Sequence, residues 1–281
     1  MLWFVLPVTA GPAVADAVDD LSDGTGLTLT ILAWVAWALG LVCVALLLPA
    51  TLTGIRVMAP AAVAAVIWAV AEVGVDGSAT VGLVVALGAS LVAFSALVGD
   101  RLVDGASYGN ERRMLLRPPT RLLVTGVPIA WVVAVAGVAG GPILLATQRW
   151  VVGVVATIVG LPLAVLALRA LHQLSRRWIV FVPTGLVLHD LQVLTEPALF
   201  RRTSILRLGP AIDGTPARDL TNRAAGLVIE CVLSDPASLG LRTPGDPRAD
   251  AELVDLRRFL FAPSRPGALL DEAEERRIAV D

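Results

Sequence analysis

Histidine and cysteine, the side chains best suited to catalysis and metal binding near neutral pH, are scarce in this chain. There are two of each: His172, His189, Cys43 and Cys231. His189 is followed by Asp190, a pair that would suit acid–base chemistry if the two side chains met. Neighbouring side chains of a strand point to opposite faces of the sheet, so we expect no dyad here. Two histidines without a cluster of cysteines or carboxylates also make no metal site.

Other patterns that mark enzymes or metal sites are equally weak. There is no phosphate-binding loop ending in Gly-Lys-Ser/Thr and no His-Glu-x-x-His. The acidic cluster Asp16–Asp23 is too loosely spaced for a calcium loop. The run Asp271–Arg277 places acids first and bases last, as the helix dipole favours, and predicts a solvated helix. We therefore expect no catalytic residues, no cofactor and no metal.

The composition is typical of a membrane protein. Of 281 residues, 56% are hydrophobic and 16% are charged, and the mean hydropathy is +0.78. Soluble domains carry about 25% charged residues. The net charge of −2 argues against nucleic acid as a partner. Cys43 lies in an apolar run and Cys231 in the C-terminal part, so we expect two buried thiols rather than a disulfide.

Long apolar runs occupy most of the first 170 residues or so. A helix needs about 20 apolar residues to cross the hydrocarbon core. Five runs meet or approach this length, at about 29–49, 57–73, 79–98, 122–146 and 150–168. Because the runs are continuous, they exclude the alternating pattern of a membrane barrel and predict an α-helical transmembrane bundle. No ionisable residue lies at the centre of a run, which argues against a coupled transporter.

The apolar segment 2–15 allows three interpretations. We favour a short first membrane helix that enters from the inside. The alternatives are the remainder of a longer helix that starts upstream, and a signal peptide cleaved after Ala13-Val14-Ala15. Pro7, Pro12 and the lack of a basic start argue against the signal peptide. The first two interpretations give six membrane helices and the third gives five, and all three leave Asp16–Asp23 outside.

Arginines predict the orientation of the bundle, because cytoplasmic loops of membrane proteins are enriched in basic residues. All 22 basic residues are Arg. The loops on one side of the predicted helices hold nine arginines, and those on the other side hold only Arg149. The nine are Arg56, Arg101, Arg112, Arg113, Arg117, Arg121, Arg169, Arg176 and Arg177. The chain is therefore expected to be a multi-pass protein of the cell membrane with its C-terminal domain in the cytoplasm.

The one substantial inside loop, 99–121, concentrates these arginines. We favour an interpretation in which they set the topology and contact anionic headgroups, an attraction of about 1 kcal/mol per residue near the surface. A sharper interpretation makes the loop a docking surface for the terminal domain or for a partner. The candidate contacts with anionic lipid or with that domain are Arg112, Arg113, Arg117, Arg121, Arg176 and Arg177. Because almost no linker follows Arg177, we expect the domain to lie close to this loop.

The chain changes character after the last apolar run, which predicts two domains, a helical bundle at 1–171 and an α+β domain at 172–281. About 110 residues are enough for a separate core. Strands are expected at 178–182, 186–189, 199–202, 204–208, 227–233 and 254–262, with a helix at 268–278. The segments 209–225 and 236–250, rich in Gly, Pro and Asp, are expected to be loops. The predicted domain is an antiparallel sheet with a terminal helix.

This order of elements resembles the bacterial pleckstrin-homology-like (PH-like) domain, a bent antiparallel sheet capped by a C-terminal helix. The residues that carry the resemblance are Trp178–Asp190, Arg201–Ile205 and Phe259–Ile278. The whole chain is also similar to a family of multi-pass membrane proteins of actinobacteria, through Ser107–Arg113, Arg176–Asp190 and Arg258–Gly267. The second resemblance implies no known activity or ligand. PH-like folds mostly bind peptides, proteins or lipid headgroups, and enzymes are rare among them.

Two functions follow as hypotheses. The first is a non-enzymatic membrane protein that anchors a cytosolic interaction or scaffolding module at the inner face of the membrane. Its partners would be the lipid bilayer and a membrane or cytosolic protein. The alternative is a transporter or lipid-handling protein with the C-terminal domain as its regulator. That alternative calls for a polar cavity among the helices, near Thr125, Gln148 and Arg149.

Overall fold

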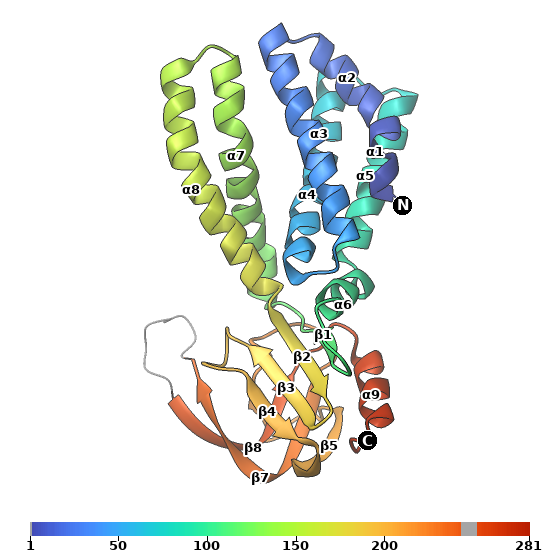
Figure 1. Ribbon diagram of the computed structural model, residues 1–281, viewed down its shortest axis with the longest axis vertical. Coiled ribbons are helices and arrows are strands. Elements are labelled where there is room, and N and C mark those ends of the chain that lie inside the picture. Colours follow the sequence, from blue (N-terminus) through green and yellow to red (C-terminus); the bar gives the residue numbers. More distant parts are fainter. Residues whose placement is uncertain (1, 243–251) are drawn as a thin grey trace. The chain divides into compact units, whose positions relative to one another are not determined.

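The computed structural model describes residues 2–242 and 252–281 and divides into two compact units (Figure 1). The first unit contains the chain up to Leu102 and Val127–His172. The second unit contains Val103–Gly126 and Gln173–Asp281. The sequence placed the whole of 1–171 in the helical domain. In the structure the segment 103–126 groups instead with the strand-rich unit.

Within the described residues, six helical stretches are long and apolar enough to cross a membrane. The first is a pair of consecutive helices, α1 (Leu2–Thr9) and α2 (Gly11–Asp19). The others are α3 (Asp23–Ala45), α4 (Pro49–Val73), α5 (Gly77–Phe94), the π-helical turn η1 (Leu122–Gly126) with α7 (Val127–Ala146), and α8 (Trp150–Leu174). The apolar helices that the sequence predicted are thus present, and residues 2–19 supply the sixth.

The N-terminal helices pack closely against α3. Trp3 and Leu6 are each 6% exposed. The indole N–H of Trp3 donates to the carbonyl oxygen of Trp37 at 2.9 Å, and the indole N–H of Trp37 donates to the carbonyl oxygen of Trp3 at 3.1 Å. Ala13, part of the signal-like triplet, lies in α2 and is buried. Residues 2–19 therefore form an integral part of the first unit.

Two helix ends differ from the sequence-based expectation. Helix α4 begins at Pro49, because proline is favoured in the first turn, where no intrahelical N–H bond is lost. Arg56 consequently lies inside α4 rather than in a loop. Its Nε donates to the carbonyl oxygen of Ala93 at 3.3 Å, and its guanidinium carbon lies 5.7 Å from the centre of the Phe94 ring. Helix α5 ends at Phe94, and a separate short helix, α6 (Ala96–Asp104), follows.

The described residues of the second unit form two four-stranded sheets. The first sheet has the order β1-β2-β3-β4 and is antiparallel throughout. Its strands are β1 (Arg112–Leu115), β2 (Arg177–Val182), β3 (Gly185–Asp190) and β4 (Ala198–Arg201). The second sheet has the order β5-β7-β8-β6. Its strands are β5 (Ile205–Pro210), β7 (Ile229–Leu241), β8 (Glu252–Phe261) and the short β6 (Arg218–Asp219), which runs parallel to β8.

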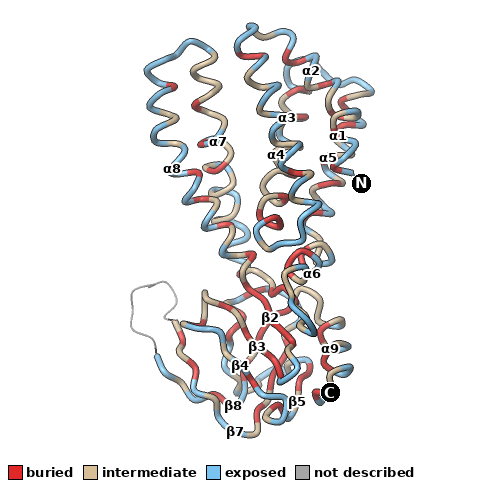
Figure 2. The backbone as a smooth tube through the Cα atoms, viewed as in Figure 1, coloured by how far each residue is buried: buried red, intermediate tan, exposed pale blue. Residues whose placement is uncertain are grey.

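The core of this unit is formed by apolar side chains of both sheets and of the terminal helix α9 (Pro266–Glu275). Phe181 and Phe259 are fully buried, and the ring of Phe259 stacks on that of Phe200 with 4.6 Å between centroids. Leu269 of α9 is fully buried as well, and Figure 2 shows buried residues along β2 and β3. A separate core of this size is what a domain of about 110 residues can form.

The predicted strands are present, and two expected loops are partly wrong. Strand β7 continues to Leu241 through Pro236, which the sequence assigned to a loop. The pairing of β7 with β8 shifts register between Val232 and Ala237, and such a bulge accommodates a proline that cannot donate to the ladder. The expected loop 209–225 contains β6. Residues 243–250 of the other loop lie outside the described residues.

Candidate functional site

The arginine-rich loop contributes a strand to the second unit. Strand β1 pairs with β2, so that Arg112 lies opposite Phe181 and Leu115 opposite Trp178. The three apolar residues at the end of β1 and just after it, Met114, Leu115 and Leu116, are 2–3% exposed. The loop is therefore part of the folded domain itself, rather than a neighbouring surface.

The segment that follows β1 is held from its other side by the end of β8. The amide of Arg117 donates to the carbonyl oxygen of Ala262 at 2.8 Å, and the amide of Ser264 donates to that of Leu115 at 2.8 Å. The amide of Leu116 donates to the carbonyl oxygen of Arg177 at 2.9 Å. Residues 112–117 are thus enclosed between β2 and the segment 262–264, and their backbone connects the two sheets.

Arg177 lies at the centre of this junction. Its side chain and that of Asp190 are each 1% exposed. Nε and Nη2 donate to the Asp190 carboxylate at 2.7–3.0 Å. Nη1 donates to the carbonyl oxygen of Arg117 at 2.8 Å, and Nη2 approaches that of Thr221 at 3.4 Å. A buried guanidinium with all three nitrogens engaged is not available to lipid headgroups.

Arg112 and Arg113 contact acidic and aromatic side chains of the same unit. Arg112 forms an ion pair with Asp104 and lies 4.0 Å from the carboxylate of Glu272 in α9. Arg113 pairs with Glu111 at 3.4 Å, and its guanidinium carbon lies 5.8 Å from the centre of a ring of Trp178. These contacts join the start of β1 to α9 and to β2.

Arg117 reaches over a glycine to two backbone carbonyls. Its Nε donates to Pro263 and its Nη1 to Ala225, both at 3.2 Å. Gly226 has φ +112°, and a Cβ at this position would lie 2.1 Å from Nη1 of Arg117. The glycine therefore supplies both the backbone conformation and the space that the arginine needs.

For the remaining two candidates, Arg121 and Arg176, the contacts involve the backbone carbonyl rather than the guanidinium. The side chain of Arg121 is exposed, and its carbonyl oxygen accepts a hydrogen bond from the hydroxyl of Thr125. Arg176 is half-buried, and its carbonyl oxygen lies 3.1 Å from Nδ1 of His189. All six candidates thus lie in the second unit, where the side chains of Arg112, Arg113, Arg117 and Arg177 bond other residues of that unit.

His189 and Asp190 do not form a dyad. The ring of His189 stacks on Trp178 with 4.6 Å between centroids, whereas Asp190 bonds Arg177 in the core. Burial lowers the pKa of His189 below its ordinary value of 6.5. Burial, with the nearby charge of Glu230, raises the pKa of the Cys231 thiol to about 12. Neither group is poised for acid–base or nucleophilic chemistry at neutral pH.

One stretch of the arginine-rich loop matches a catalytic motif. Gly105-Ala106-Ser107-Tyr108-Gly109 fits the Gly-x-Ser-x-Gly pattern of serine hydrolases. That pattern requires a strand before the serine and a helix after it. Here α6 precedes the turn and β1 follows it, and the Ser107 hydroxyl donates to the carboxylate of Asp104 at 3.0 Å. The match therefore indicates a capped turn rather than a nucleophile.

No metal centre is evident in the part of the chain that the structure describes. Within residues 2–242 and 252–281, no three His, Cys, Asp or Glu side chains gather where they could hold an ion. Gln148 and Arg149, which the transporter hypothesis placed beside a polar cavity, are exposed in the turn between α7 and α8.

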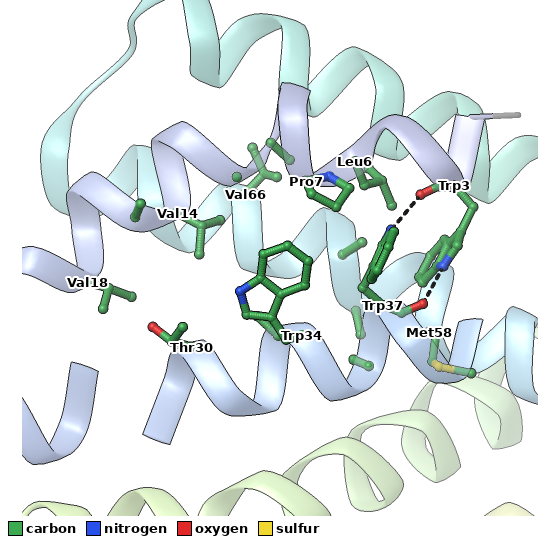
Figure 3. A pocket seen from close by; sticks show the side chains of 17 residues that line it. Trp3, Leu6, Pro7, Val14, Val18, Thr30, Trp34, Trp37, Met58 and Val66 are labelled. Carbon is green, nitrogen blue, oxygen red and sulfur yellow. Dashed lines mark hydrogen bonds between the residues drawn. The ribbon is translucent and has the colours of Figure 1, made fainter. Parts of the chain in front are cut away.

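The first unit instead contains an apolar cavity of about 320 Å³ (Figure 3). It lies among the N-terminal helices, α3 and α4, and tryptophans form much of its wall. Trp3 and Trp37 lie at one end, where Met58 also contributes, and Trp34 lies near the middle. Thr30 and Val18 lie at the other end. The cavity has a size typical of small-molecule sites.

Two features of the chain are thus candidates for a function: the junction of β1 with β2 and residues 262–264, and the tryptophan cavity. Both are described from the structure of this chain alone. Comparison with protein-family models, with curated proteins and with solved structures found no match.

Proposed function

We propose that the chain is a non-enzymatic, multi-pass protein of the cell membrane whose helices hold a PH-like interaction module at the cytoplasmic face. The observation that carries the proposal is β1. A strand from between two apolar helices completes the sheet of the C-terminal domain, and its backbone bonds both β2 and the end of β8. The C-terminal domain is therefore assembled from segments on both sides of the last two apolar helices in the sequence.

The chain connections support the same interpretation. Only Ser175 and Arg176 separate α8 from β2, and the segment 116–121 separates β1 from η1. A domain joined by such short segments is kept near the membrane surface whatever else it binds. The unequal distribution of arginines supports the cytoplasmic side. The two sheets followed by α9 agree with the PH-like resemblance, which implies recognition of a protein, a peptide or a headgroup.

The test is capture of a binding partner by the wild type and by two variants, each of which alters only one unit. Tagged full-length protein is purified from its native membrane together with Phe181→Asp, which disrupts the core of the second unit, and Ala38→Phe, an exposed position of α3. We expect a stable partner with the wild type and with Ala38→Phe, and its loss with Phe181→Asp at equal membrane insertion.

Two results would contradict the proposal. A partner retained equally by all three proteins would show that the helices, not the domain, make the interaction. Saturable substrate transport by the purified protein in liposomes would favour the transporter hypothesis instead.

A further inference from the structure

The tryptophan cavity of the first unit differs in polarity between its two ends. At the Trp3–Trp37 end, both indole N–H groups are used in the reciprocal bonds to backbone carbonyls, so the rings offer only apolar faces. Met58 adds a polarisable thioether to this end. Flat aromatic ligands pack well against such a wall, by stacking on indole faces and by contact with sulfur.

The rest of the cavity contains an unused donor. The indole N–H of Trp34 has no hydrogen-bond partner among the described residues. In Figure 3 the Trp34 nitrogen lies on the side of the ring nearer Thr30, whose side chain lies at the Val18 end of the cavity. Thr30 and Trp34 are four residues apart and therefore share a face of α3. Both residues line the cavity although each is exposed, Trp34 to 54%, and they add two hydrogen-bond donors to an otherwise apolar wall.

The position of Trp34 along α3 makes this donor unusual. Helix α3 has 23 residues, and Trp34 is its middle residue, about 16 Å from either end at ~1.5 Å per residue. Membrane tryptophans usually lie at the interfaces, where headgroups and water satisfy the indole N–H. At mid-helix the surrounding hydrocarbon offers no acceptor, and an unsatisfied donor there is costly. A ligand with an acceptor that dissolves in the bilayer interior would remove this cost.

From these observations we infer that the cavity binds a lipid-soluble quinone. The flat ring lies against Trp37 and Trp3, and a ring carbonyl accepts hydrogen bonds from the Trp34 indole and the Thr30 hydroxyl. Phospholipid tails would also fill an apolar cavity, but they have no acceptor at this depth and no need of an aromatic wall. The inference concerns binding alone, and it goes beyond the interaction role proposed for the second unit, which it does not require.

The test uses purified full-length protein in detergent and a benzoquinone with a ten-carbon tail. Quinones quench indole fluorescence, so binding is followed directly. We expect saturable quenching at one quinone per protein. Ala36→Phe fills the cavity from α3 and should weaken binding at least about tenfold, whereas Ala38→Phe on the same helix, outside the cavity, should leave it unchanged. Trp34→Phe should weaken it about fivefold, the loss of one neutral hydrogen bond.

Three results would overturn the inference. The first is quenching that rises without saturation in the wild type and in Ala36→Phe alike, since that is simple partitioning. The second is equal competition by decanol, which would mark a plain hydrocarbon site. The third is unchanged affinity in Trp34→Phe. If Ala36→Phe does not fold, Ala62→Leu fills the same cavity from α4 and gives the same comparison.

Discussion

The Arg177–Asp190 pair is the polar centre of the second unit. Both side chains are 1% exposed, and the guanidinium bonds one carboxylate and two backbone carbonyls from three separate segments. Burying two charges is expensive, and such a pair stabilises a fold only when the remaining donors and acceptors are satisfied. Here the remaining guanidinium donors are satisfied by the carbonyl oxygens of Arg117, in the segment after β1, and of Thr221. The pair therefore specifies where the loop docks.

Removing one partner should be far more damaging than removing both. In Arg177→Met the Asp190 carboxylate stays buried without a counter-charge, so we expect the second unit to lose about 3–5 kcal/mol of unfolding free energy. The double variant Arg177→Met/Asp190→Leu should recover more than half of that loss. Amide hydrogen exchange of β2 and β3 in the full-length protein measures both. Arg121→Met, at an exposed position, is the control and should change little. A mild single variant would show that the pair is not essential to the junction.

His189 should make the second unit sensitive to mild acid. Burial lowers its folded-state pKa below 6.5, so the unfolded chain binds the proton more readily than the native protein does. The free energy of unfolding is therefore unaffected by His189 above about pH 6.5. It decreases as the pH falls below this value, because the unfolded chain then binds the proton. Replacement by Phe keeps the stack on Trp178 and removes the proton. Hydrogen exchange between pH 7 and pH 5 should show a decline in the wild type that is shallower in His189→Phe. Identical slopes would rule out this role.

At the scale of elements, β1 shows what a single sequence conceals. The hairpin β2–β3 was predicted because its strands are adjacent and a Pro-Thr-Gly turn joins them. Strand β1 has no such signal, because its partner β2 lies some sixty residues away, beyond two apolar helices. The clue was the apolar triplet Met114-Leu115-Leu116 among arginines, which a purely lipid-facing loop would not need. The tryptophan cavity was missed for the same reason, since Trp3 and Trp37 meet only in the fold.

For Arg177 and Pro236 the local sequence predicted a different environment from the one in the structure. Beside the last apolar run, Arg177 resembles an arginine at the lipid interface. In the strand it faces the core, where Asp190 neutralises it. Pro236 usually ends a strand, but a register shift lets β7 continue past it. In both cases a tertiary partner, invisible to local pattern, decided the outcome.

The contact of Arg117 over Gly226 gives a prediction at the same scale. Gly226→Ala forces a side chain into a positive φ and into the arginine, whereas Gly214, also at positive φ (+79°), has open space around it. We expect Gly214→Ala to cost about 1–2 kcal/mol from backbone strain alone, and Gly226→Ala clearly more. Exchange of the amides of Arg117 and Ser264 measures the difference. Equal effects would mean that Arg117 simply moves aside.

At the scale of the whole molecule, the second unit should fold without the membrane helices if it keeps strand β1. Residues 116 and 177 are joined by a backbone hydrogen bond, so a short Gly/Ser linker can replace 122–174 and connect 103–121 to 175–281. We expect this chain to be a soluble monomer with a cooperative thermal transition. Residues 175–281 alone would expose the edge of β2 and should aggregate. A well-behaved 175–281 fragment would show that β1 is dispensable.

The orientation of the whole protein is the remaining inference from charge, and two exposed residues can test it. Ser22 lies beside the acidic cluster predicted to be outside, and Tyr108, 87% exposed, lies in the arginine-rich loop predicted to be inside. In a Cys43→Ala background, Cys231 can stay, because a buried thiol with a pKa of about 12 is not a thiolate at neutral pH. A membrane-impermeant maleimide should label Ser22→Cys but not Tyr108→Cys in intact cells, and inverted vesicles should reverse the pattern. The opposite labelling would place the second unit outside the cell and would remove the basis for a cytoplasmic partner.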